Sequence, residues 1–106
     1  MYIDKLKNAV ENGRIEWQKH ALERMLQRGI SRDMVKRVIL SGELIESYPD
    51  DEPFPSGLFL GWADREPYHV VIAFDLETSY CFVITAYSPD LEHFEGDFKT
   101  RRSHVE

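Results

Sequence analysis

Three residues whose side chains can do chemistry recur every four positions: His20, Arg24 and Arg28. In a helix this spacing places them on one slanted stripe beside the apolar one. A histidine can accept or donate a proton near neutral pH, and an arginine can stabilise the charge of a phosphate. The stripe therefore predicts an anion-binding edge with a proton-transfer group. A solvated helix face with ion pairs, such as Glu16 with His20, would give the same pattern.

A second set of polar residues lies in the two strongest predicted strands: His69, Thr85 and Tyr87. Alternate strand residues share a face, and if Phe74 pairs with Tyr80 across the intervening loop, His69 lies directly opposite Thr85. The three side chains would then gather at one end of the sheet face that the helices leave uncovered. Such a cluster fits a catalytic site, whereas each residue alone also fits an ordinary sheet position.

Together the two sets predict a small metal-independent ribonuclease, because histidine, arginine and tyrosine can transfer protons and stabilise a phosphate without a cofactor. The histidines show no spacing typical of a metal site. They are His20, His69, His93 and His104. The single cysteine, Cys81, lies in an apolar strand and is predicted to pack rather than react. We therefore expect no cofactor.

The pattern of apolar residues predicts the elements that position these side chains. Helices are predicted over about residues 2–12, 18–28 and 32–41. Strands are predicted over 44–48, 58–63, 68–74 and 80–87, with a short helix over 90–95. Gly29 is expected to end the second helix and Ser31 to cap the third.

Helices followed by strands indicate an α+β fold, with N-terminal helices packed on one face of a roughly four-stranded antiparallel sheet. Strand alternation assigns the larger apolar sets to the helix side. These sets are Tyr68, Val70, Ile72 and Phe74 in one strand and Tyr80, Phe82, Ile84 and Ala86 in the next. We expect a single domain over residues 1–106, with a flexible tail over 101–106.

The chain of 106 residues carries a net charge of −6, which at face value argues against nucleic-acid binding. The charge is uneven, because residues 1–40 carry +4, residues 41–75 carry −7 and residues 76–106 carry −3. This pattern fits either a local anion site beside an acidic patch for a basic partner or a mixed soluble surface. No apolar run reaches about 18 residues and no secretion signal is recognisable, so we expect a cytoplasmic protein without a membrane span.

Five segments carry a resemblance to known proteins. They are HALERMLQRGIS (20–31), GELIESYPDDEPFPS (42–56), HVVIAFD (69–75), ITAYSPD (84–90) and DFKTRR (97–102). They are similar to an uncharacterised family of small bacterial and archaeal proteins that resembles the RelE-like toxins (MqsR and BrnT type) of type II toxin–antitoxin systems. The resemblance implies a RelE/barnase–EndoU-like fold, an endoribonuclease that cleaves mRNA, free or on the ribosome, and a cognate antitoxin of zinc-finger and helix-turn-helix build. RelE-like toxins are usually basic, so the acidic net charge of this chain argues against strong binding of free RNA, although it is compatible with cleavage of RNA held by another macromolecule.

Among the polar positions of these motifs we assign two sets of residues. The catalytic set is His20, His69, Arg24, Thr85 and Tyr87. The phosphate-binding set is Arg28, Arg101 and Arg102. In the expected reaction the two histidines act as acid and base while the 2′-hydroxyl attacks the adjacent phosphate to give a 2′,3′-cyclic product. The alternatives are a non-catalytic protein-binding module and a toxin relative without activity.

Overall fold

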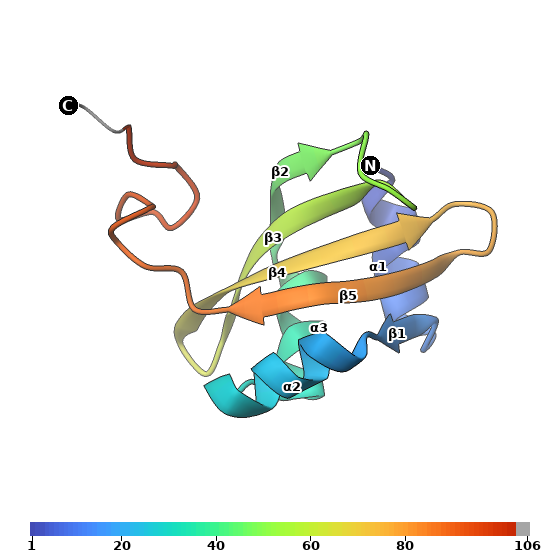
Figure 1. Ribbon diagram of the computed structural model, residues 1–106, viewed down its shortest axis with the longest axis horizontal. Coiled ribbons are helices and arrows are strands. Elements are labelled where there is room, and N and C mark those ends of the chain that lie inside the picture. Colours follow the sequence, from blue (N-terminus) through green and yellow to red (C-terminus); the bar gives the residue numbers. More distant parts are fainter. Residues whose placement is uncertain (104–106) are drawn as a thin grey trace.

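The computed structural model describes residues 1–103 and has an α+β architecture, in which the helices lie on one side of a sheet (Figure 1). The elements in chain order are α1 (Ile3–Glu11), β1 (Ile15–Trp17), α2 (Lys19–Arg28), α3 (Arg32–Ser41), β2 (Glu43–Tyr48), β3 (Ser56–Ala63), β4 (Glu66–Asp75) and β5 (Tyr80–Tyr87). No helix within these residues is long and apolar enough to cross a membrane.

The sheet has five strands in the order β1-β5-β4-β3-β2, and all neighbours are antiparallel except β1, which runs parallel to β5. The prediction of four antiparallel strands is therefore corrected to a five-stranded mixed sheet. The additional strand, β1, lies between the first two predicted helices, where no strand was predicted because three residues are too few to show the alternating pattern of a strand. Ile15 pairs with Cys81 and Trp17 with Val83, so this strand depends on a partner far along the chain.

The helix boundaries follow local signals in the sequence. α2 ends at Gly29, whose φ of 69° gives a left-handed C-cap that favours glycine. α3 begins after Ser31, whose hydroxyl accepts a hydrogen bond from the backbone N–H of Met34 at 3.1 Å. Both predicted helix signals are confirmed.

The main core lies between the helices and one face of the sheet. All three helices contribute fully buried apolar residues to it: Leu6, Ala9, Val10, Ala21, Met25, Val35, Val38 and Ile39. The third helix lies close against the sheet at Gly61, where a Cβ atom would lie only 2.3 Å from the carbonyl oxygen of Val38. Any side chain at position 61 would therefore push α3 away from β3.

The pairing of β4 with β5 differs from the predicted register. Asp75 extends β4 and pairs with Tyr80, so Phe74 pairs with Cys81 instead of with Tyr80. The register then shifts at a bulge in β5, where Ile84 has no partner in β4. The extra residue in one strand changes which side chains share a face beyond it.

This register decides which residues of β5 face the helices. Cys81, Val83 and Ala86 lie in the main core, whereas Phe82 and Ile84 lie on the opposite face, contrary to the prediction. The predicted core face of β4 is confirmed. The bulge explains how Ala86 nevertheless points to the helices, as predicted.

We call the sheet face away from the helices the outer face. Residues 49–55, between β2 and β3, fold over one end of it, and residues 90–102, which we call the strap, fold over the other end (Figure 1). Four apolar residues are buried on this side, outside the main core. They are Leu58, Leu60, Ala73 and Phe94.

The strap consists of turns, and the helix predicted over 90–95 does not form. Its chain doubles back so that Arg101 forms an isolated antiparallel bridge with Phe94. The first residue of the tail predicted over 101–106, Arg101, is thus part of the folded strap. The last three residues of this tail, which include His104, lie outside the described residues.

Candidate functional site

His69 lies on β4 at the strap end of the outer face and is fully buried. Its Nε2 lies 2.6 Å from the carbonyl oxygen of Phe98, which can only accept, so Nε2 carries the proton. Its Nδ1 lies 3.3 Å from the hydroxyl of Tyr87 and accepts from it. Burial lowers the pKa of His69, and the Phe98 carbonyl opposes this only in part. The imidazole is therefore neutral, with both ring nitrogens in hydrogen bonds.

Tyr87 is the accessible partner of this pair. It pairs directly with His69 across the sheet and is half-buried, with the two rings edge to face at 5.4 Å. Burial raises the pKa of the Tyr87 hydroxyl, and the charges of Arg101 and Arg28 act in the opposite direction. The hydroxyl therefore stays protonated at neutral pH, and a proton can pass from it to His69.

Arg28 reaches from the end of α2 to the free edge of β5. Its Nη1 donates to the carbonyl oxygen of Ala86 at 2.8 Å and lies 3.4 Å from the hydroxyl of Thr85. This edge is open because β1 pairs with β5 only from Cys81 to Val83. Within residues 1–103 the other N–H groups of the Arg28 guanidinium have no hydrogen-bond partner, so they can bind an anion.

The structure brings together part of the sequence-predicted site. Thr85 and Tyr87 share the outer face with His69, as predicted, but the residue opposite His69 is Tyr87 and not Thr85. The residue opposite His69 is thus two positions later in β5 than predicted. One position comes from the pairing of Asp75 with Tyr80, and the other comes from the bulge at Ile84. Arg28 joins this cluster from the helix, so part of the predicted stripe does meet the sheet.

The other two stripe residues lie elsewhere. The His20 side chain is 89% exposed, and its Nδ1 lies 3.8 Å from Glu23, not beside Glu16. Arg24 is exposed, with no hydrogen bond or ion pair recorded to any of residues 1–103. Within residues 1–103 His20 contacts Glu23 and His69 contacts Tyr87 and Phe98, so the two histidines of the predicted acid–base pair share no hydrogen-bond partner.

Two residues that the sequence reasoning missed, Glu46 and Tyr48, hold the strap against β2. Glu46 accepts two hydrogen bonds from Arg101, at 2.6 Å from Nε and 3.0 Å from Nη2, and a third from the Tyr48 hydroxyl. The Arg101 guanidinium also lies over the Phe94 ring, 4.9 Å from its centre, and it lowers the pKa of Glu46. Their alternation along β2 could have shown that Glu46 and Tyr48 share a face.

Both arginines assigned to phosphate binding in the strap are engaged in ion pairs. Arg101 pairs with Glu46, and Arg102 lies 3.0 Å from Glu95 and donates to the carbonyl oxygen of Leu91. In the described state their charges are therefore compensated by neighbours. Of the three assigned arginines, Arg28 is the one that forms no ion pair within residues 1–103, so its charge is not compensated by a neighbouring carboxylate.

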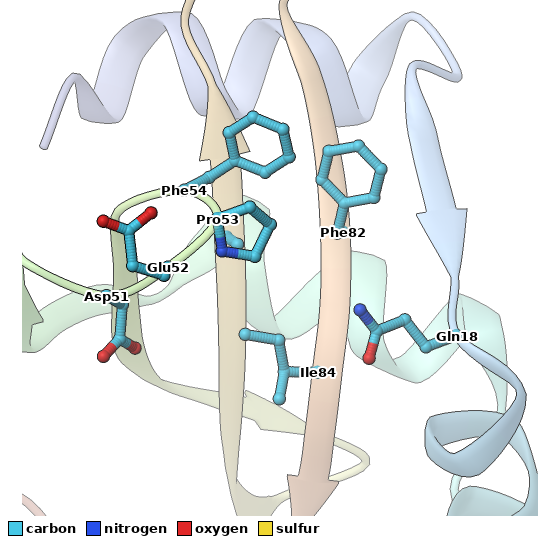
Figure 2. Close-up of a pocket in the computed structure, with 8 residues that line it drawn as sticks. Gln18, Asp51, Glu52, Pro53, Phe54, Phe82 and Ile84 are labelled. Carbon is cyan, nitrogen blue, oxygen red and sulfur yellow. The ribbon is translucent and has the colours of Figure 1, made fainter.

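A pocket of about 370 Å³ lies on the outer face at the end covered by residues 49–55 (Figure 2). Figure 2 shows the Phe54 and Phe82 rings beside each other above it, with Ile84 below and the Gln18 amide at the opposite wall from the loop. Its lining residues are Gln18, Asp51, Glu52, Pro53, Phe54, Ala73, Phe82 and Ile84. No motif in the sequence predicts this pocket, because its walls come from four separate segments.

Metal and thiol chemistry have little support in the described residues. Residues 1–103 contain no group of three or more His, Cys, Asp or Glu side chains that could hold a metal ion. Cys81 is fully buried, and burial raises the pKa of its thiol to about 12. The prediction that Cys81 packs in the sheet is confirmed.

Comparison with known proteins gives one match. Residues 17–88 match a family model described as "Domain of unknown function (DUF4258)". No curated protein and no solved structure matches the chain. The matched segment runs from the end of β1 to just beyond β5, so α1 and the strap lie outside it.

Proposed function

The chain belongs to the DUF4258 family, a domain of unknown function, and we propose that it is a toxin-like endoribonuclease that cleaves RNA at the cluster of Arg28, Thr85, Tyr87 and His69. The observation that carries the proposal is the convergence of an arginine from α2 with a hydrogen-bonded tyrosine–histidine pair on β5 and β4. An anion-binding group beside a proton-transfer pair is what phosphodiester cleavage requires. Under this proposal the protein acts in the cytoplasm, needs no cofactor and is held inactive by an antitoxin.

The proposed reaction is a transesterification. Tyr87 accepts the proton of the ribose 2′-hydroxyl while its own proton passes to Nδ1 of His69, whose imidazolium form the Phe98 carbonyl stabilises. The 2′-oxygen forms a bond to phosphorus and the bond to the 5′-oxygen breaks. A water molecule protonates the leaving 5′-oxygen, and His69 returns its proton through Tyr87 to the resulting hydroxide. The products are a 2′,3′-cyclic phosphate and a free 5′-hydroxyl.

In this scheme Arg28 stabilises the negative charge that develops on the phosphate. The Ala86 carbonyl orients the guanidinium, while the N–H groups not bonded to β5 face the substrate. Thr85 shares the outer face with Tyr87 and lies 3.4 Å from Nη1 of Arg28, so its hydroxyl can position the phosphate by a hydrogen bond. The net charge of −6 disfavours tight binding of free RNA, so the expected substrate is RNA held by another macromolecule, such as mRNA on the ribosome.

The test combines growth arrest on induction in a bacterial host with mapping of RNA cuts. We expect Tyr87→Phe to lower cleavage by about 10²- to 10⁴-fold, because it removes the proton relay. Arg28→Gln should lower it by about 10²- to 10³-fold. Matched controls are Tyr80→Phe, on the same strand, and Arg24→Gln, one turn earlier on α2. Cleavage at the wild-type rate by folded Tyr87→Phe and Arg28→Gln would refute the proposal.

A non-catalytic protein-binding module is the second candidate, and one observation favours it. His69 is fully buried and both of its ring nitrogens are bonded, as in a structural histidine. A binding module would cause no RNA cuts, and any arrest would survive Tyr87→Phe. Arrest without cleavage by a well-expressed wild type would therefore favour this candidate over the ribonuclease.

A further inference from the structure

The pocket on the outer face has apolar walls. Phe54 and Phe82 stack with ring centres 5.3 Å apart and planes inclined by 11°, and Ile84 extends the same surface. The ring of Pro53 closes the side nearest the loop (Figure 2). These walls would exclude water from the alkyl part of a ligand and offer aromatic surface to a cation.

Every charged group that lines the pocket is negative. Asp51 and Glu52 stand on the loop side, Gln18 supplies an amide at the other wall, and no lysine or arginine is among the lining residues. Asp51 accepts a hydrogen bond from the buried Ser56 hydroxyl, which fixes its position. Within residues 1–103 neither carboxylate forms an ion pair, so both are available to a cation from outside.

We propose that this pocket binds an arginine side chain of a basic polypeptide partner. The alkyl part of the arginine would lie against Phe82 and Ile84, and its guanidinium would reach Asp51 and Glu52. Arginine fits better than lysine because its planar head both stacks on aromatic rings and forms paired hydrogen bonds with carboxylates. The proposal does not depend on RNA cleavage.

Two further features favour a single basic side chain over other occupants. A volume of about 370 Å³ lies near the lower limit of ligand pockets, so it accommodates one long side chain and not a packed helix. The segment of residues 41–75, which contains the loop, carries a net charge of −7, which attracts basic polypeptides and repels the phosphates of RNA. The partner is therefore identified by its chemistry as a positively charged protein segment.

The proposal is tested by NMR titration of the isotope-labelled full chain with the capped tripeptide acetyl-Gly-Arg-Gly-amide. We expect a dissociation constant of roughly 1 mM, the scale of a few weak contacts. The amide shifts should be largest at Glu52, Phe54 and Phe82. The matched probe is the citrulline tripeptide, which keeps the shape of arginine but has no charge, and it should not bind. Tyr87→Phe should bind like the wild type, which separates this result from the outcome for RNA cleavage.

Variants locate the interaction. Glu52→Gln and Phe82→Leu should each weaken binding by about tenfold, equivalent to about 1.4 kcal/mol. The control Asp50→Asn removes the same charge from the same loop at a residue that does not line the pocket, and it should bind like the wild type. The spectrum of each variant also reports whether it is folded.

Three results would overturn the proposal. Equal shifts with the citrulline tripeptide would show that the pocket binds apolar chains without regard to charge. Equal weakening by Asp50→Asn and Glu52→Gln would show general attraction to the loop and not a site. Shifts of the pocket residues by tetrauridylate but not by the arginine tripeptide would make the pocket a base-binding subsite for RNA.

Discussion

The two faces of the sheet are covered in different ways. Regular helices cover the inner face, and the buried residues of the main core on that side are apolar. Irregular segments cover the outer face, which holds Ser56 and His69, the two fully buried polar residues among residues 1–103. The inner face is thus built mainly by burial of apolar area, whereas the outer face depends on specific polar contacts.

The polar contacts of the outer face connect each covering segment to the sheet. Asp51 of the loop accepts from Ser56, and Phe98 of the strap accepts from His69. Glu46 on β2 holds Arg101 of the strap. Polar residues near the proposed active site therefore also have a structural role. The effects of substituting them on stability and on activity need to be measured separately.

Phe59→Ala should produce the largest loss of stability, because Phe59 is fully buried in the main core. We expect the free energy of unfolding to fall by about 3–5 kcal/mol. The comparison is Phe82→Ala on the outer face, which is only half-buried and should cost less. Urea denaturation measures both, and an equal loss at the two positions would contradict the contrast between the faces.

His69→Leu should cost about 1–3 kcal/mol, because it leaves the Phe98 carbonyl and the Tyr87 hydroxyl without their partner. It should also loosen the strap. Hydrogen exchange of the amides of residues 93–102 should accelerate more than that of the helix α1. Uniform acceleration in both regions would mean that His69 does not act locally.

The pH dependence of stability should identify His69 as neutral in the folded state. Its folded pKa is lowered by burial, so between its unfolded pKa of about 6.5 and that lower value only the unfolded chain binds the proton. The contribution of His69 to the free energy of unfolding is therefore fully present above about pH 6.5. It decreases as the pH falls below this value, by at most about 1.4 kcal/mol per pH unit. His69→Gln should lack this slope, so the slope should remain in the difference in stability between wild type and variant, and equal slopes in the two proteins would contradict this assignment.

Glu46→Gln should have a smaller effect, below about 1 kcal/mol, because Arg101 is more than half exposed and solvent screens the pair. The Tyr48 hydroxyl can still donate to the glutamine oxygen. Raising the salt concentration should reduce the difference between wild type and variant. A difference that salt does not change would indicate packing of the strap and not charge as the cause.

His20→Ala should have the smallest effect, with no measurable change in the urea midpoint, because the side chain is 89% exposed. If the ribonuclease proposal is right, RNA cleavage should also persist, since the relay runs through Tyr87 and His69. Loss of cleavage in the folded His20→Ala variant would revive the two-histidine mechanism predicted from the sequence.

The sequence predicts the features whose causes are local. The helices are found within a residue or two of their predicted limits because their ends carry their own signals, such as Gly29 and Ser31. The alternation within β4, with Val70, Ile72 and Phe74 facing the helices, is likewise predicted correctly, whereas the shared face of His69, Thr85 and Tyr87 also depends on the bulge at Ile84. The helix ends and the alternation within β4 need no knowledge of distant partners.

The features that were missed depend on contacts between distant segments. Strand β1 exists through its pairing with β5, and the bulge at Ile84 moves Tyr87 opposite His69. Burial of His69 requires the strap, which the sequence does not place against β4. The spacing of His20 with Arg28 describes one helix correctly, but only Arg28 at its end reaches the sheet.

The parallel pairing of β1 with β5 has a consequence for how the chain folds. The Cys81 thiol donates to the carbonyl oxygen of Leu6 across 75 positions of sequence, so α1 and β1 reach their sheet partner only after residues 81–83 have been synthesised. Contacts with such large sequence separation require a costly loop closure and slow folding. During translation α1 can contact α3 early, as Lys7 does with the carbonyl oxygens of Leu40 and Gly42, whereas β1 must wait for β5 to emerge from the ribosome.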